Sequence, residues 1–597
     1  MTANGCIRRL LTSATALFVL FAFWSACDAA DTQKVLRIAS SDVTSLDPQQ
    51  GTDLASTRVT GAIFEGLYQF DYFAEPATVI PNTAAGMPEF ADGGRTWTIR
   101  LQRGILFASD PAFGGKPREL VAEDYVYSIK RSLDPTLRNG GDSMLADLIV
   151  GARAVVDAAS VPGARFNYEA PIAGLRALDS HTLRITLTAL DYTLLDRLAS
   201  PPAFAVAREA VESAGVDVIR RPVGTGPYRL RDWQRGSRIL LEANPQYRHV
   251  TFPDSTDTRH RAVIEAMKNK TLPRIGRIEI NFVQDSQAAL RAFDRQALDY
   301  VALAADDTAR VLAGDKLKSA YTRRGIVHLR FGVPTLTFTY FNMRDPTVGG
   351  YTREQIALRQ AIAMGFDTSE LIRVQYGGNA LQATQLLPPG VTGHDPALAA
   401  KSLYDPAGAR ALLDRNGFKD RDGDSYRETP DGKQLTLLRG SLPEAWHRAV
   451  DALWSRNMQA IGIRMNVKQE PFADMMNMSR NSKLPMFNLG VRSLEPSGFQ
   501  VLQTLWGQSP TEVNPSRFSQ EEYDRAYAQF LRTPAGPQRT QLARQMSEIA
   551  QAYMPLLLQT FGVGNVLLQP WVQGYWPSQF GFAWKYLDID VARARRR

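Results

Sequence analysis

Cysteine is almost absent from this 597-residue chain. The two that it has, Cys6 and Cys27, both lie within the first 27 residues. The rest of the chain therefore has no structural disulfide, no thiolate metal site and no thiol catalysis.

Histidine is also scarce, and catalytic patterns are missing. No two of the six histidines have metal-type spacing, and no Gly-x-Ser-x-Gly elbow occurs. We therefore expect no enzymatic activity, no bound metal and no cofactor. The histidines are His181, His249, His260, His328, His394 and His447.

The first 27 residues have a composition of their own. Arg8 and Arg9 precede an apolar run over residues 10–24, which is too short to remain as a membrane helix. This order is typical of a secretory signal. Two cleavage modes are open. Ser-Ala-Cys is similar to a bacterial lipobox and would make Cys27 a lipid-attachment site, whereas cleavage two or three residues later would release a soluble protein.

The body of the chain also lacks a large excess of positive or negative charge. The formal net charge is +8, and the first 27 residues contribute two arginines and no acid. Four more arginines lie among the last five residues, so the body carries only about +2. The basic character comes mainly from a tail over 591–597, and we expect no nucleic-acid partner.

Strand and helix patterns mix along the chain, which favours an α/β class. Alternating apolar residues predict half-buried strands, and apolar residues at helical spacing predict amphipathic helices. A Thr352/Gln355 capping box marks one helix start. The strands are expected at 36–38, 97–101, 183–187 and 278–282, and the helices at 58–67, 121–133 and 352–365.

The segment over 222–228, Pro-Val-Gly-Thr-Gly-Pro-Tyr, concentrates backbone constraints. Gly224 and Gly226 permit backbone angles that other residues avoid, and the prolines fix φ. The segment predicts a tight turn that leads into a strand. It is neither a dinucleotide fingerprint nor a phosphate loop, because Arg229 replaces the third glycine and no Gly-Lys-Ser/Thr follows.

This turn, the Arg235-Gly236 pair and Asn-Pro-Gln-Tyr at 244–247 together resemble family 5 of the bacterial solute-binding proteins, the peptide and nickel receptors of ABC importers. Phe-Glu-Gly-Leu at 64–67 and Leu-Arg-Gln-Ala-Ile-Ala at 358–363 extend the resemblance over roughly residues 35–590.

The resemblance implies a bilobal periplasmic-binding-protein fold of type II, similar to cluster C, with an extra subdomain in the first lobe. The implied parts are residues 31–70, 190–335 and 556–590 as the base of lobe I, 71–190 as its extra subdomain, 336–555 as lobe II, and 591–597 as the basic tail.

The resemblance also places the solute. In peptide-binding relatives, the strand here at 487–492 pairs its backbone with the ligand. An aspartate that takes the peptide ammonium stands where this chain has Arg492. An arginine would suit a carboxylate, a phosphate or a carbonyl-rich group instead. An offset of the strand, or pairing of Arg492 with Asp47, is the alternative. The expected ligand-binding residues are Arg492, Asn488, Gly490, Ser45 and Asp47.

Two further patterns have structural explanations. Asp420, Asp422 and Asp424 have the spacing of a calcium loop, but glycine and glutamate are missing at its sixth and twelfth positions, so a turn is favoured. Trp446 and Trp454, eight residues apart on one helix, are expected to be core residues.

The expected function is that of a monomeric periplasmic receptor, soluble or lipid-anchored to a membrane. It would capture a peptide-like solute and deliver it to the permease and ATPase of an ABC importer. The alternatives are an anionic, opine-like, haem or metal-chelate solute, an exported chaperone-like binding protein, and a secreted hydrolase.

Overall fold

The computed structural model describes residues 30–51, 53–137, 143–215, 220–398, 404–444 and 446–595. The expected signal segment and Cys27 lie outside the described residues, as do the last two arginines of the basic tail.

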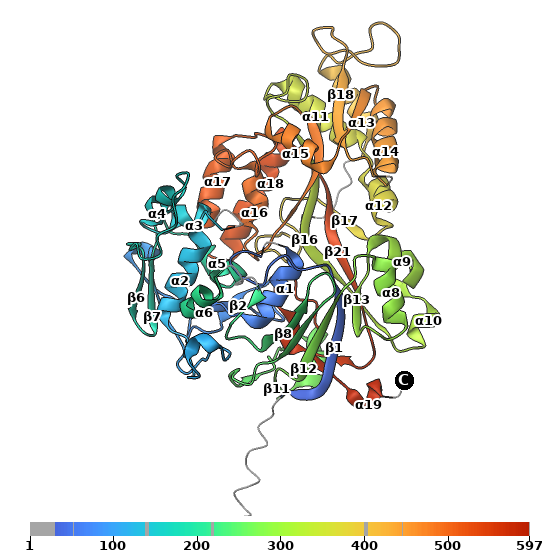
Figure 1. The fold of residues 1–597 in the computed structure, drawn as a ribbon. Coiled ribbons are helices and arrows are strands. Elements are labelled where there is room, and N and C mark those ends of the chain that lie inside the picture. Colours follow the sequence, from blue (N-terminus) through green and yellow to red (C-terminus); the bar gives the residue numbers. More distant parts are fainter. Residues whose placement is uncertain are drawn as a thin grey trace, which may run out of the picture.

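One sheet of 11 strands runs through the whole molecule (Figure 1). We call lobe I the part built on β8, β9, β12, β1 and β13, and lobe II the part built on β17, β18, β19 and β20. In order across the sheet the strands are β19 (Arg464–Gln469), β18 (Thr436–Ser441), β20 (Met486–Arg492), β16 (Val327–Phe341), β21 (Leu556–Leu568), β13 (Tyr300–Ala302), β1 (Asp31–Ser40), β12 (Ile275–Phe282), β9 (Arg238–Ala243) and β8 (Tyr228–Gln234), and β17 (Ala380–Gln382) pairs with β21.

Two long antiparallel strands, β16 and β21, join the lobes. Residues 327–333 of β16 pair with 562–568 of β21, and residues 336–340 pair with 556–561. The register shifts between Val333 and Leu336. A bulge of this kind bends paired strands. The predicted lobe boundary at residues 335 and 336 lies next to this shift, and β21 pairs with β17 of lobe II up to Gly562.

A second sheet forms a separate layer of lobe I, within the range expected for the extra subdomain. Trp97 and Ile99 are fully buried on one of its faces, as their alternation predicts. The elements of this layer are β4 (Glu89–Ala91), β5 (Thr96–Arg100), β7 (Thr182–Thr186), β6 (Leu175–Asp179), α2 (Ala122–Leu133), α3 (Ser143–Leu148) and α4 (Ala152–Ala159).

Helices of lobe II cover its part of the sheet. The Thr352/Gln355 capping box is present, with Gln355 N–H donating to Thr352 Oγ1 over 3.3 Å. Trp454 is fully buried, but Trp446 precedes the helix and is 53% exposed, so the expectation that both tryptophans are core residues is wrong. The helices are α11 (Arg353–Gly365), α12 (Thr368–Tyr376), α13 (Pro406–Arg415), α14 (His447–Ala460), α15 (Phe472–Arg480), α16 (Phe499–Leu502), α17 (Glu521–Leu531) and α18 (Pro537–Tyr553).

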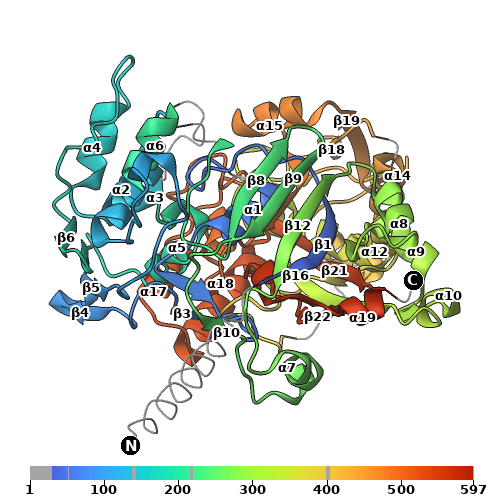
Figure 2. The same ribbon diagram turned by 60° about the horizontal axis from the view of Figure 1, so that its bottom comes forward.

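The remaining elements belong to lobe I, where α1 packs against β8 (Figure 2). The helices are α1 (Leu54–Ile63), α5 (Leu194–Leu198), α6 (Arg208–Ala214), α7 (Arg261–Met267), α8 (Ser286–Asp294), α9 (Ala305–Val311), α10 (Ser319–Thr322) and α19 (Val591–Ala594). The short strand pairs are β2 (Tyr68–Phe70) with β3 (Val79–Pro81), β10 (Val250–Thr251) with β11 (Thr271–Leu272), β14 (Leu312–Ala313) with β15 (Lys316–Leu317), and β22 (Val572–Gln573) with β23 (Asp588–Ile589).

The glycine turn leads into β8, as expected, but its glycines serve a different purpose. Neither has a positive φ. A Cβ on Gly224 would lie 2.2 Å from the Ile63 carbonyl oxygen, and one on Gly226 would lie 2.6 Å from the same group. The turn is therefore glycine-rich because it packs directly onto the end of α1, where Gly226 N–H donates to Ile63 O over 2.8 Å.

Three sequence motifs of lobe I meet at one buried carboxylate. Glu65, which is 4% exposed, accepts from Thr225 Oγ1 over 3.0 Å, from the Tyr247 hydroxyl over 3.3 Å and from Arg248 Nη1 over 2.5 Å. These contacts join the ends of α1, the glycine turn and the Asn-Pro-Gln-Tyr segment. They identify the motifs as scaffold of lobe I.

Candidate functional site

The strand expected to receive the solute, β20, has one edge that is almost unpaired. Along its full length from Met486 to Arg492 it pairs with β16. On the other side β18 meets it at a single position, Arg439 opposite Met486. Beyond Met486, the outer edge of β20 has no strand partner in the part of the chain that the structure describes.

The hydrogen-bond alternation of β20 identifies the groups that are left open. Ser493 N–H donates to Pro334 O over 2.7 Å, and Asn342 N–H donates to Pro485 O over 2.8 Å. In an antiparallel pair such bonded positions alternate, so the odd-numbered residues of β20 bond to β16. The N–H and C=O groups of Asn488, Gly490 and Arg492 therefore point to the open edge. These are three of the five residues expected at the site.

The side chains beside this edge leave space for a solute. Gly490 is exposed, and a Cβ there would meet no atom closer than 3.9 Å. The Asn488 side chain is held by residues of the neighbouring strands, because its Nδ2 donates to Gln559 Oε1 and, over 3.2 Å, to Phe338 O. Leu489 and Val491 pack against the hydrophobic core from the opposite face of the strand. The face that carries Gly490 is thus both open and polar.

Arg492 ends β20 opposite Thr335, next to the register shift of β16. Its guanidinium has no ion pair and no hydrogen bond among the described residues. Burial lowers the pKa of Arg492 from its ordinary value, and the positive charge of Arg58 lowers it further. An arginine stays protonated in proteins, so the site holds an uncompensated cation.

Ser45 and Asp47 do not join this site. Both are 1% exposed. The carboxylate of Asp47 accepts from Arg131 over 2.9 and 2.7 Å, and Ser45 Oγ accepts the Asp47 N–H over 3.0 Å. The two residues are enclosed within lobe I in this conformation, because the carboxylate is used to neutralise a buried arginine. The alternative that Asp47 pairs with Arg492 is thereby excluded here.

Sequence reasoning missed exposed apolar residues near the carboxyl ends of β18, β19 and β20. β18 runs parallel to both β19 and β20, so the carboxyl ends of the three strands meet at one edge of the sheet. The segments that follow these ends carry Trp446, Phe472 and Leu494, which are 53%, 55% and 64% exposed. Topology brings them to one edge, and no local pattern marks them.

Sequence reasoning also missed Arg58. It is the one charged residue in the helix α1, whose sequence is Leu-Ala-Ser-Thr-Arg-Val-Thr-Gly-Ala-Ile. This lone charge is a signal that could have drawn attention to it. Arg58 is exposed, and it too has no ion pair or hydrogen bond within the described ranges.

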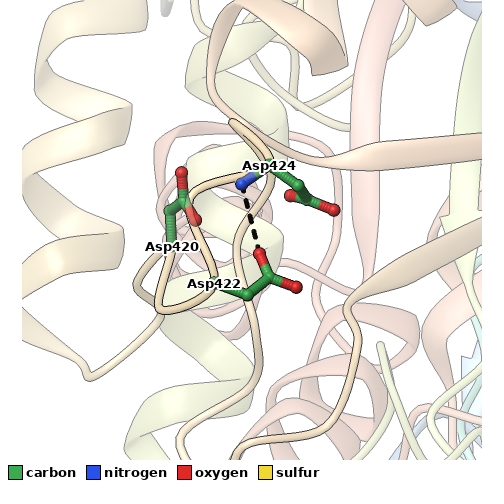
Figure 3. A group of neighbouring side chains, drawn as sticks. All are labelled: Asp420, Asp422 and Asp424. Atoms are coloured by element: carbon green, nitrogen blue, oxygen red, sulfur yellow. Dashed lines mark hydrogen bonds between the residues drawn. The ribbon is translucent and has the colours of Figure 1, made fainter.

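The aspartate cluster of lobe II is a self-contained turn (Figure 3). The carboxylate oxygens of Asp420, Asp422 and Asp424 lie within 4.8 Å of one another. However, Asp420 accepts backbone N–H groups of Gly423 and Ser425 over 2.7 and 3.0 Å, and Asp424 forms an ion pair with Arg464. Backbone N–H groups of the loop and Arg464 of β19 thus provide partners for the carboxylates of Asp420 and Asp424.

Among the described residues, none of the helices combines the length and the apolar character that crossing a membrane requires.

Comparisons with known proteins agree with this architecture. The chain is 23% identical over 551 residues to the glutathione-binding protein GsiB of Salmonella choleraesuis. This match covers 90% of this chain and 91% of that protein. It is 25% identical over 526 residues to di/tripeptide-binding protein 2 of Pseudomonas aeruginosa, covering 85% and 88%.

The structure of HbpA2 from Haemophilus parasuis superposes with a TM-score of 0.72 at 18% identity, covering 93% of this chain and 99% of that one. This likeness confirms the α/β periplasmic-binding-protein fold. The model of the bacterial extracellular solute-binding proteins, family 5, matches residues 78–512. The chain therefore belongs to family 5 of the bacterial extracellular solute-binding proteins.

Proposed function

We propose that this protein captures a peptide or a peptide-like solute between its lobes. The observation that carries the proposal is the open edge of β20, where Asn488, Gly490 and Arg492 present unpaired N–H and C=O groups. An extended peptide can add to such an edge as a further strand, with its backbone recognised independently of its side chains. The names of two relatives, a glutathione-binding and a di/tripeptide-binding protein, support the same solute class.

The exposed apolar residues that follow the carboxyl ends of β18, β19 and β20 suit the side chains of such a solute. Trp446, Phe472 and Leu494 are each more than half exposed. Contact with a solute would remove their apolar surface from water, which is favourable at roughly 25 cal/mol per Å². These residues and the backbone edge would act together, the edge holding the main chain and the apolar residues its side groups.

Solute capture would be coupled to closure of the two lobes, which β16 and β21 connect. A solute that contacts both lobes favours the closed arrangement, because only there are both sets of contacts made. The closed protein would then deliver its solute to the permease and ATPase of an ABC importer in the inner membrane. We place it in the periplasm as a monomer, either soluble or anchored through Cys27.

Strand addition can be tested through its alternation. Tripeptides and tetrapeptides that bind would be found by native mass spectrometry of the purified protein, and a binder would then be N-methylated at each residue in turn. Methylation of residues that bond to β20 should weaken binding roughly 2- to 10-fold, whereas methylation of the alternate residues should not. Equal sensitivity at every position would refute strand addition.

The protein side offers a matching test. Gly490→Pro removes an N–H that faces the open edge and breaks no bond to β16, so the strand should persist. It should lower the affinity for the unmethylated peptide by a similar factor. If no short peptide binds the wild-type protein, the proposed solute class is wrong, and a non-peptide solute takes its place.

A further inference from the structure

One arginine from each lobe lies near the junction between the lobes. Arg492 lies at the end of β20 in lobe II, opposite Thr335 and beside the register shift at which β16 passes between lobes. Its backbone belongs to the open edge. The side chain is partly buried, which makes an unpaired charge there costly.

Arg58 reaches the same junction from lobe I. The buried face of α1, including Val59 and Ile63, packs into the core of lobe I, and Arg58 lies on its exposed face. The charge of Arg58 acts on the phenols of Tyr300 in β13 and of Tyr575, lowering the pKa of each against the rise caused by burial. Figure 1 shows α1 beside the region where β16 and β21 cross between the lobes.

The two positive charges act on each other without a counter-charge. Arg58 lowers the pKa of Arg492, so the guanidinium groups are within electrostatic reach of one another. Neither forms an ion pair or a hydrogen bond among the described residues. Asp47, considered from the sequence as a partner for Arg492, forms an ion pair with Arg131 instead. Arg492 is partly buried, and charges that are removed from water are normally paired in native proteins, so its lack of a partner indicates an anion from outside the chain.

We infer that the solute carries a carboxylate that binds between Arg58 of lobe I and Arg492 of lobe II. This inference rests on the proposed function and narrows it to peptide-like solutes that have a free carboxylate at one end. A planar guanidinium matches a carboxylate through two parallel hydrogen bonds, and each carboxylate oxygen can accept from a different arginine. A carboxylate placed there neutralises both charges and contacts both lobes, so it also favours closure.

The geometry relative to β20 sets where this carboxylate lies on the solute. Arg492 is the last residue of the open edge, so its side chain stands beside one end of an added strand. The carboxylate therefore belongs to a terminal residue of the solute, as the α-carboxylate or as a side chain of that residue. A free ammonium at this end would add a third positive charge and is excluded.

The first experiment needs no solute. In the wild-type protein the two arginines repel each other, so Arg58→Gln and Arg492→Gln should each raise the Tm at low ionic strength, and the double variant should gain less than the sum of the two. Arg353→Gln, at an exposed arginine of α11 with no partner among the described residues, is the matched control and should leave the Tm unchanged. Additive effects, or no rise in either variant, would overturn the convergence of the two arginines.

The second experiment measures the anion directly. Malonate should raise the Tm of the wild-type protein more than chloride does at equal ionic strength, and this excess should disappear in Arg58→Gln and in Arg492→Gln but persist in Arg353→Gln. An excess that persists in either of the first two variants would overturn the proposal. So would the absence of any excess in the wild type.

The third experiment separates this inference from the proposed function. Tripeptides would be compared with their terminal-amide forms, and glutamate-ended with glutamine-ended peptides, by calorimetry. Loss of the carboxylate should weaken binding roughly 10- to 150-fold in the wild type, and this difference should fall below about threefold in Arg58→Gln. If acid and neutral forms bind equally well, the anion site is wrong while peptide capture stands. If neither binds but malonate still stabilises, peptide capture is wrong while the anion site stands.

Discussion

Asp196 provides a quantitative test of how the two lobes are held together. It lies on α5 and is 8% exposed, and its carboxylate accepts the backbone N–H of Ser497, which follows β20 in lobe II, over 3.1 Å. Arg539 and Arg197 are the cations that act on it, but burial outweighs them and raises the pKa of Asp196 from 3.8 to about 6. Relative to the unfolded chain, the folded protein is thus more stable when Asp196 is protonated.

The sign and size of the effect follow from proton linkage. A carboxyl whose pKa is higher in the folded than in the unfolded protein contributes stability that is fully present below pH 3.8 and is lost as the pH rises through about 6. The shift from 3.8 to about 6 corresponds to about 3 kcal/mol. Asp196→Asn removes the charge and keeps an oxygen that can accept from Ser497. It should therefore match the wild type near pH 4 and exceed its stability by up to about 3 kcal/mol at pH 7.5.

The measurement is urea denaturation of both proteins between pH 4 and pH 8, followed by tryptophan fluorescence, with small-angle scattering to report separation of the lobes. Asp474→Asn, at an exposed aspartate of α15, is the control and should show no such trend. A stability difference between wild type and Asp196→Asn that is constant with pH, or that shrinks as the pH rises, would refute the reasoning.

Three further outcomes are expected. Gly226→Ala should lower the Tm strongly, since its Cβ would lie 2.6 Å from the Ile63 carbonyl group, whereas Gly86→Ala, with no atom within 4 Å, should be neutral; equal melting of the two would contradict the close-approach argument. Glu65→Gln should cost roughly 3–5 kcal/mol in denaturation experiments by leaving the Arg248 cation without its anion, and an unchanged midpoint would count against the buried network. Adding EDTA or calcium should leave the Tm unchanged, because the aspartate turn satisfies its own carboxylates; a calcium-dependent rise would show a metal site there.

Local patterns predicted the elements well where one side of the chain is buried. The alternation of Trp97 and Ile99 and the capping box at Thr352 both appear as expected. The first helix is displaced: it was expected at 58–67 and spans Leu54–Ile63. The helix begins after Asp53, which accepts the Ser56 N–H over 2.7 Å. It ends before Glu65, whose carboxylate binds partners about 160–180 residues away in the chain.

The candidate site could be predicted in part. Its strand was recognised by resemblance, and the structure shows why Asn488, Gly490 and Arg492 form an open edge. Asp47 could not be placed from the sequence, because whether a carboxylate faces a solute or an internal cation depends on Arg131, which is distant in the chain. Trp446 was misjudged for a similar reason, since helical spacing does not reveal that the helix begins after it.

The sequence by itself determined the family and the α/β class, and it predicted the strand at which a solute would add. These follow from motifs and periodicities that are local, because backbone turns and amphipathic faces depend on residues close in the chain. Only the tertiary structure decided which charges remain uncompensated. Arg58 and Arg492 are 434 positions apart in the chain, yet in the folded protein the charge of Arg58 lowers the pKa of Arg492, and neither has an ion pair among the described residues. Whether a charge is compensated depends on the residues that surround it in the folded protein, and a local sequence pattern does not show which residues those are.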